Sequence, residues 1–249
     1  MKLNLTLIAF LLIFAVSCKS QTPPTSVKNP SANPSKNLTA VSYESKLKAV
    51  ADERLKIADE YKKATDQTTR KEILQRARQI FVASINNDIF PDWYGTDWDF
   101  YGTTEKPGEG KIACGYFVST VLRDAGLKVS RVSMAQQASE NIIKSLTTEP
   151  FINRYRNLSL EKFVAEIEKL GAGLYVVGLD FHVGFLYHDG AKLHFIHSSY
   201  VEPSETIKET AAASPVLGAT KYRVVGKISD DDALILKWLH QTAVPTVKR

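Results

Sequence analysis

Two strand-like segments joined by a tight turn constrain this chain more than any other feature. Residues 181–188 (FHVGFLYH) and 191–199 (AKLHFIHSS) are apolar and β-branched or aromatic in large part, and only Asp189 and Gly190 lie between them. An Asp-Gly pair between such runs is the strongest short-range signal for a β-hairpin with a two-residue turn. We therefore predict an antiparallel hairpin, and with it a sheet, in this part of the chain.

The predicted hairpin register brings two histidines together. A turn at Asp189-Gly190 places His182 directly opposite His197, with Cβ atoms about 4.5–5.5 Å apart on one face, and His194 on the other face. The first face is otherwise apolar and suited to packing on a helix. Three interpretations are open: hydrogen-bonded structural histidines, metal ligands, or a catalytic base with its orienting partner. Two ligands without a nearby third fit a zinc site poorly.

Helical patterns precede the strands along the chain. Apolar residues at three- and four-residue spacing predict a helical hairpin over 43–63 and 69–85. The apolar stripe of its first helix is predicted to consist of Leu47, Val50, Ala51, Leu55, Ala58 and Tyr61. Further helices are expected over 111–127, 134–146, 159–170 and 230–241, and further strands over 174–179 and 221–228. Helices first and an antiparallel sheet second indicate an α+β fold.

The first residues of the chain resemble an export signal. One lysine is followed by an apolar run that closes on AVSC, which resembles the lipobox of bacterial lipoproteins with Cys18 as the lipidated residue. The alternative is cleavage by ordinary signal peptidase, with Cys18 incidental. We expect a signal peptide over 1–17, a Pro-, Ser- and Asn-rich disordered tether over 18–42, and one domain over 43–245 whose first part, 43–88, is the helical hairpin.

The charge of the chain excludes few functions. It contains 32 Lys and Arg against 27 Asp and Glu, for a formal net charge of +5, without a long basic run. This mild bias is typical of a mixed-charge surface, and no nucleic-acid motif accompanies it. We expect a membrane contact through the N-terminal lipid and no nucleic-acid partner.

The second cysteine begins a predicted helix. The stretch KIACGYFVSTVLRDAGL has helical apolar spacing after Cys114, and Gly126 is a typical helix end. If Cys18 carries lipid, Cys114 has no disulfide partner in an exported protein, so it is either a buried, inert thiol or a reactive one. A helix N-terminus favours thiolate over thiol, so we expect Cys114 to react below the ordinary thiol pKa near 8.5.

These motifs together resemble the NlpC-type cell-wall cysteine peptidases of the papain-like superfamily. The matching features are the cysteine that begins a helix, the strand with HVGFLY, the DG turn and the strand with FIHSS. The resemblance implies a papain-like fold with Cys114 as nucleophile, His182 as base and His197 as its orienting residue. It implies hydrolysis of amide bonds in peptidoglycan peptides at the bacterial envelope, with no metal or organic cofactor.

The chain departs from that family at two places. The family's GTPYxWGGT-like stretch is GTDWDFYGT here, with Trp98 at the position of the tyrosine and Phe100 at that of the tryptophan. Tyr101 or Tyr94 would then supply the missing hydroxyl, so Trp98, Tyr101 and Tyr94 are the predicted substrate-binding residues. The second departure is at the nucleophile, where ACGY replaces DCSG.

Two other functions stay open. One is a papain-like module without turnover that binds envelope glycan or peptide through Trp93, Trp98, Phe100 and Tyr101. The other is a thioester-forming amidase or acyltransferase that acts on a different substrate, because hydrolysis and transfer pass through the same intermediate. Aromatic residues such as these are also common in cores.

Overall fold

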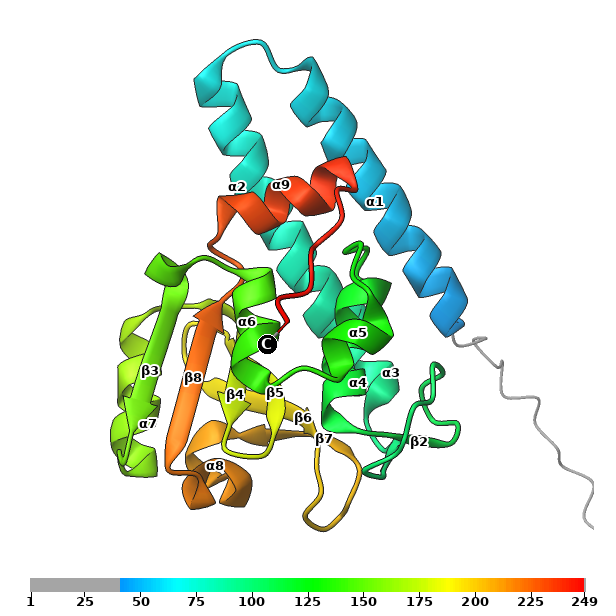
Figure 1. Cartoon of the computed structure of the whole chain (residues 1–249). Coiled ribbons are helices and arrows are strands. Elements are labelled where there is room, and N and C mark those ends of the chain that lie inside the picture. The colour runs from blue at the N-terminus through cyan, green and yellow to red at the C-terminus, as the bar shows by residue number, and fades with distance from the viewer. Residues whose placement is uncertain (1–40, 249) are drawn as a thin grey trace, which may run out of the picture. The chain divides into compact units, whose positions relative to one another are not determined.

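The structure is a computed structural model that describes residues 41–248. The signal peptide predicted at 1–17, Cys18 and nearly all of the tether predicted at 18–42 lie outside the described residues. Within the described part, helices and an antiparallel sheet form an α+β fold, with the helices concentrated in the first half of the chain (Figure 1).

Two antiparallel helices begin the described part, as the sequence predicts. Helix α1 (Tyr43–Lys63) follows the N-cap Ser42, and α2 (Gln67–Ala83) follows the N-cap Asp66. Both cap side chains accept a backbone N–H of the first turn, which stabilises each start. Helix α2 continues into a π-helical segment, η1 (Ser84–Ile89), and a short α3 (Phe90–Trp93).

The predicted apolar stripe of α1 is wrong in one detail. Leu55 is 55% exposed, whereas Arg54 and Ile57 are buried. The aliphatic part of Arg54 lies beside Gly126, so a long charged side chain covers apolar surface where a leucine was expected. The rest of the predicted stripe is confirmed, since Val50 is buried and Leu47, Ala58 and Tyr61 pack against the core.

A six-stranded antiparallel sheet forms the second half of the fold. Its order is β3-β8-β4-β5-β6-β7, so the predicted hairpin occupies central positions. The strands are β3 (Ile152–Arg156), β4 (Gly173–Leu179), β5 (Val183–His188), β6 (Leu193–Ser198), β7 (Thr206–Thr210) and β8 (Tyr222–Lys227). The short strands β1 (Asp97–Trp98) and β2 (Lys111–Ile112) form a separate parallel pair. Strands β3 and β7, on the two edges, were not predicted.

The two faces of the sheet are covered by different helices. On one face lies α4 (Cys114–Asp124), which contacts β5 and β6, together with α6 (Ser139–Leu146), which contacts β4 and β8. On the other face the apolar side chains of α7 (Leu160–Lys169) and α8 (Pro215–Ala219) form a second core. The helix predicted over 134–146 is in fact two helices, because α5 (Arg131–Ala135) ends before α6 begins.

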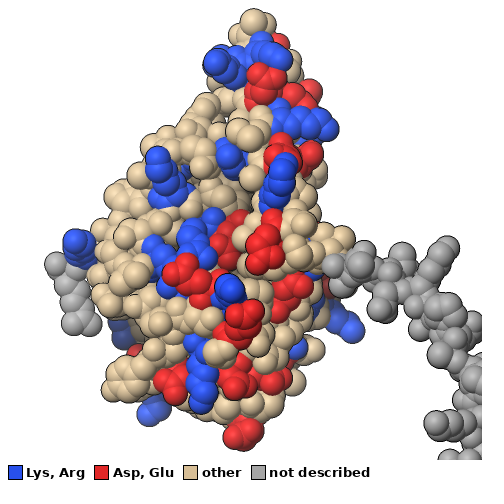
Figure 2. Space-filling view, turned by 90° about the vertical axis from the view of Figure 1, so that its right-hand side faces the viewer, with Lys and Arg blue, Asp and Glu red and all other residues tan. Residues whose placement is uncertain are grey.

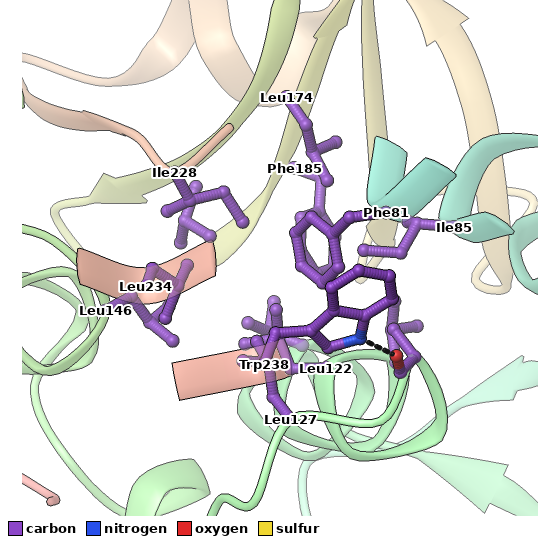
Figure 3. Packing of buried hydrophobic residues seen from close by; sticks show 14 of the residues in the cluster. Phe81, Ile85, Leu122, Leu127, Leu146, Leu174, Phe185, Ile228, Leu234 and Trp238 are labelled. Carbon is purple, nitrogen blue, oxygen red and sulfur yellow. Dashed lines mark hydrogen bonds between the residues drawn. The ribbon is translucent and has the colours of Figure 1, made fainter. Parts of the chain in front are cut away.

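The closing helix completes the larger core. Helix α9 (Asp232–His240) packs on α1 and α2 and inserts Trp238 among apolar side chains from distant parts of the chain, including Phe81 and Leu122 (Figure 3). The indole N–H of Trp238 donates to the carbonyl of Ala125 at 2.6 Å, at the C-terminal end of α4. The core thereby fixes the helix that begins at Cys114.

The β5–β6 turn lies one residue later than predicted. Gly190 and Ala191 are its central residues, because the N–H of Asp189 bonds to the carbonyl of Lys192 and Gly190 has φ of +99°. The Asp189 carboxylate accepts the N–H groups of Ala191 and Lys192, so Asp189 closes the turn instead of occupying its centre. His188 therefore pairs with Leu193.

This shift corrects the predicted pairing of the two histidines. Tyr187 pairs with His194 and Leu186 with Phe195, so His182 is not directly opposite His197. Since the paired partner moves by two residues, every side chain keeps its face, and His182 and His197 stay on one face as diagonal neighbours. His194 lies on the opposite face, as expected.

The second correction concerns the face that carries the cysteine helix. Phe117 of α4 packs on Phe185, whose side chain points to the face opposite that of the histidines. The ring of His197 stacks on Phe195, with 3.9 Å between ring centroids, in the second core. Helix α4 and His197 are therefore on opposite faces of the sheet. Only a residue at the end of a strand can reach both sides, and His182 directly precedes β5.

Charged residues are distributed without a large patch of one sign on the face in Figure 2, where Lys and Arg alternate with Asp and Glu. Ion pairs between neighbouring helical turns include those of Lys48 with Asp52 and of Lys63 with Asp59. None of the described helices has the length and hydropathy needed to span a bilayer.

Candidate active site

Cys114 is the first residue of α4, held by contacts on both sides. The preceding residue, Ala113, is the N-cap, and its N–H donates to the carbonyl of Gly102 at 2.9 Å. The hydroxyl of Ser198 on β6 donates to the carbonyl of Ile112 at 2.7 Å in a buried position. The chain leading to Cys114 is thus tied both to the aromatic loop and to the sheet.

The surroundings of Gly115 explain why the chain has glycine where the DCSG motif of the family has serine. A Cβ atom at this position would lie 2.3 Å from the carbonyl oxygen of Ala135, which is closer than any real contact. Helix α5 therefore packs directly on the first turn of α4, and a serine in place of Gly115 would force the two helices apart. The family residue is excluded here by close backbone packing.

A tight turn positions His182. The N–H of Leu179 donates to the carbonyl of His182 at 2.8 Å, so Asp180 and Phe181 form the tip of the β4–β5 connection. The carboxylate of Asp180 accepts the N–H of Lys221, which fixes that tip. His182 is only 4% exposed, whereas Phe181 beside it is 96% exposed.

His182, His197 and Glu209 form a continuous hydrogen-bonded chain. Nε2 of His182 lies 2.9 Å from Nδ1 of His197, and Nε2 of His197 lies 3.1 Å from Oε1 of Glu209. His197 is fully buried. Glu209 lies on the edge strand β7, where it pairs with Phe195, so it shares the face of His197. Sequence reasoning missed Glu209 because strand β7 was not predicted.

The carboxylate of Glu209 determines which nitrogen carries the proton on each of the two imidazole rings. An ionised Glu209 only accepts hydrogen bonds, so His197 carries its proton on Nε2 and its Nδ1 accepts. His182 must then donate through Nε2, and the Nδ1 of the neutral ring is left as an acceptor. Nδ1 of His182 makes no hydrogen bond with another described residue. It is therefore available to take a proton.

The protonation states agree with this assignment. Burial alone would raise the pKa of Glu209, but hydrogen bonds from His197 and Ser214 lower it below its ordinary value. Burial lowers the pKa of His197 despite the carboxylate. Burial, and to a smaller extent the charge of His197, lowers the pKa of His182 well below 6.5. Both rings are neutral and Glu209 is charged at neutral pH.

The thiol departs from expectation. Burial raises the pKa of Cys114 above its ordinary value, and the backbone N–H groups of Val183, Gly115 and Cys114 offset only part of this rise. The predicted low pKa is therefore wrong for this state of the protein, since the neutral imidazole contributes no positive charge that would stabilise the thiolate. Cys114 rests as a thiol and forms no disulfide in the described part of the chain.

Cys114 and His182 share one pocket. It has a volume of about 380 Å³ and is also lined by Phe181, Val183 and residues of α5, α6 and the segment that joins them. In the described part of the chain, the side chains of Cys114 and His182 are not hydrogen-bonded to each other. A neutral thiol and a neutral imidazole thus lie at the same cavity.

An aromatic group lies beside His182. The ring of Tyr200 lies 5.3 Å from that of His182 and 6.2 Å from that of Trp98, in each case between centroids. Trp98 pairs with Ile112, two residues before Cys114. Trp98, one of the predicted substrate-binding residues, therefore contacts Tyr200 and not His182 itself. Tyr200 and Phe181, which contact or line it, were missed.

The two predicted tyrosines lie elsewhere. Tyr101 is 84% exposed and contacts Phe100, and it does not line the Cys114 pocket. Tyr94 packs against the larger core, and burial raises its pKa to about 12. Neither places its hydroxyl in that pocket. Trp93, offered as a ligand-binding residue, is fully buried and donates to the hydroxyl of Tyr43, so it belongs to the core.

Within residues 41–248, no group of three His, Cys, Asp or Glu side chains is arranged to hold a metal ion. Comparison of the chain with protein-family models, with curated proteins and with solved structures gave no match.

Proposed function

We propose that the protein is a papain-like cysteine hydrolase that cleaves amide bonds through Cys114, His182 and His197, with Glu209 as a fourth member of the chain. The observation that carries the proposal is the hydrogen-bonded series Glu209–His197–His182, which leaves Nδ1 of His182 as a proton acceptor in the pocket of Cys114. A nucleophile, a base and a group that fixes the base are what thiol-based acyl transfer requires.

The reaction begins with the Cys114 thiol and the His182 imidazole both neutral. The Cys114 sulfur attacks the substrate carbonyl carbon while its proton passes to Nδ1 of His182, and the carbonyl oxygen becomes an oxyanion. The backbone N–H of Cys114 makes no hydrogen bond with another described residue and lies at the N-terminal end of α4, where an oxyanion is stabilised. Glu209 stabilises the positive charge that develops on the two imidazoles.

Collapse of the intermediate completes the cycle. The carbon–nitrogen bond breaks, the amine leaves with the proton from His182, and a thioester remains on Cys114. Water then attacks the thioester while His182 accepts its proton, and the carboxylic acid is released as the thiol regains that proton. No other reactant enters these steps.

The proposed substrate class is the peptide part of peptidoglycan, reached by a lipid-anchored protein at the bacterial envelope. The motifs HVGFLY and FIHSS and the sequence AVSC support this, together with the exposed rings of Phe181 and Tyr200 beside the pocket. Exposed aromatic rings at a cleft offer apolar contact area for an extended substrate. Mass spectrometry of the native protein tests the anchor: an acyl group is expected on Cys18 as the first residue.

The decisive experiment compares the two cysteines. The full chain, the Cys114→Ala variant and the Cys18→Ser variant are incubated with purified peptidoglycan fragments, and newly released amino groups are quantified. Loss of Cys114 should reduce hydrolysis by at least about 10³-fold because the covalent route is closed, while Cys18→Ser should leave it unchanged. Equal rates for Cys114→Ala and the parent chain would refute the proposal, and binding without turnover in both would favour a non-catalytic module.

A further inference from the structure

One charged side chain lies in the wall of the Cys114 pocket. Asp180, at the tip of the β4–β5 connection, is the only Asp, Glu, Lys or Arg among the described residues that line this cavity of about 380 Å³. It is exposed to solvent, and an exposed carboxylate is negatively charged at neutral pH. Because the thiol of Cys114 and the ring of His182 are both neutral, Asp180 determines the sign of the charge in the pocket.

The Asp180 carboxylate is oriented by the backbone and keeps one oxygen free. Its Oδ2 accepts the N–H of Lys221 at 2.8 Å, and its Oδ1 accepts no hydrogen bond from another described residue. The guanidinium of Arg223, on the neighbouring strand β8, donates to the carbonyls of Leu158 and Leu217 instead. Since the side chain is exposed, the free oxygen can accept a hydrogen bond from a ligand in the pocket.

Exposed aromatic rings gather around the same pocket. The described part of the chain exposes four aromatic side chains, which are those of Phe100, Tyr101, Phe181 and Tyr200. Phe181 lines the pocket and is 96% exposed, and the ring centroid of Tyr200 lies 5.3 Å from that of His182. The other two directly precede Gly102, whose carbonyl accepts the N–H of Ala113 beside the nucleophile. The faces of such rings attract cations, most strongly where a carboxylate is close.

The loops that carry these rings contain no basic residue. The segments GTDWDFYGT (95–103), DFH (180–182) and SYVEPSE (199–205) include no Lys or Arg, although the whole chain has a formal net charge of +5. Besides Asp180 they contain four further carboxylates, those of Asp97, Asp99, Glu202 and Glu205. Charge complementarity therefore favours a cationic ligand over an anionic one on this side of the molecule.

We propose that Asp180 selects substrates that carry an ammonium group, which pairs with its carboxylate and packs on the ring of Phe181 while Cys114 attacks a nearby amide. This inference rests on the proposed function, because it assigns a substrate class to the same site. The N-terminal end of α4 favours negative charge at the attacked carbonyl, so the positive charge belongs to another part of the substrate. A side-chain amine and a free N-terminus both provide it.

The first test measures charge selection without hydrolysis. Cys114 of the Cys18→Ser chain is labelled with cationic 2-aminoethyl or anionic 2-sulfonatoethyl methanethiosulfonate, each of which forms a mixed disulfide and releases methanesulfinate. At low salt, Asp180→Asn should lower the ratio of the cationic to the anionic labelling rate by at least about threefold. Asparagine can still accept the N–H of Lys221, and Glu168→Gln on α7 should leave the ratio unchanged. An unchanged ratio in Asp180→Asn, or no labelling of the folded chain, would overturn the proposal.

The second test compares substrates. Peptidoglycan fragments with free amines should be cleaved with a kcat/KM about tenfold above that of the same fragments after N-acetylation, and Asp180→Asn should cleave both alike. Fragments with the sugar attached have no free peptide N-terminus, so their comparison with sugar-free peptides shows which amine is recognised. Equal cleavage of acetylated and free fragments by the parent chain would overturn charge selection and leave hydrolysis standing. Cleavage of neither would refute the proposed hydrolysis, and the labelling ratio then decides charge selection by itself.

Discussion

The two histidines at the ends of β5 differ in one respect that separates their roles. His182, directly before the strand, belongs to a hydrogen-bonded chain that ends in a carboxylate, so its tautomer is fixed. His188, the last residue of the strand, is nearly as buried, yet its Nδ1 has no partner. Both rings are fixed in place, but only the ring of His182 is hydrogen-bonded to a group that determines which of its nitrogens carries the proton.

This difference shows how burial should be interpreted at a candidate site. A buried imidazole whose neighbours satisfy one nitrogen and leave the other facing a cavity is prepared for proton transfer. A buried imidazole whose nitrogen is unpaired and inaccessible to solvent carries only the energetic cost of the missing hydrogen bond. The following predictions test that distinction.

The largest effect is expected at His182. His182→Ala removes the group that accepts the thiol proton, so kcat/KM for peptidoglycan fragments should fall by at least about 10³-fold. The matched variant His188→Ala, at the other end of the strand, should leave kcat/KM unchanged. Steady-state kinetics on both variants, with circular dichroism to confirm folding, makes the comparison. Similar losses in both would mean that the two ends of β5 do not have separate roles.

The next effect is expected at Glu209. Glu209→Gln keeps the size of the side chain but removes the charge, and an amide can donate as well as accept, so the tautomers of His197 and His182 are no longer fixed. Hydrolysis should fall by about 10²-fold. Glu209→Asp should recover part of the rate, and Glu168→Gln, an exposed carboxylate on α7, should have no effect. Rates equal to the parent in Glu209→Gln would exclude Glu209 from the chain.

Glu209 also shows which part of the candidate site could not be predicted from the sequence. Cys114, His182 and His197 could be singled out from the sequence because each lies in a short motif with strong local signals: a helix start, a strand and an Asp-Gly turn. Glu209 lies on an edge strand, TIKET, whose polar residues and short length give no strand pattern, and its contact with His197 spans 12 residues of sequence. Only the paired sheet brings the two together.

The hairpin shows a different kind of limit. The sequence identified the two strands and the correct face for each histidine, but not the turn residues, because an aspartate can either occupy the turn or close it with its side chain. The structure shows the second case at Asp189. The face assignment survived because the error was an even number of residues. Which helix covers which face depends on the whole chain, and that part of the prediction failed.

An intermediate effect is expected on stability in mild acid. Burial lowers the pKa of His182 and of His197 below 6.5. As pH falls below 6.5, the unfolded chain therefore binds protons that the folded chain does not, and stability falls, by up to about 1.4 kcal/mol per pH unit for each proton. Urea unfolding at stepwise pH values measures this, and His182→Gln should reduce the slope. A slope just below pH 6.5 that His182→Gln leaves unchanged would contradict the buried neutral rings.

The smallest effect is expected when His188 is replaced by an apolar side chain. His188→Leu removes an unpaired buried nitrogen, so the free energy of unfolding should stay the same or rise by up to about 1 kcal/mol. His182→Leu should do the opposite and destabilise the protein by about 1–3 kcal/mol, because it leaves Nδ1 of His197 buried without a partner. Urea unfolding at pH 7.5 compares the two. If His188→Leu is as destabilising as His182→Leu, then Nδ1 of His188 has a partner in the free protein, and the two ends of β5 differ less than their contacts indicate.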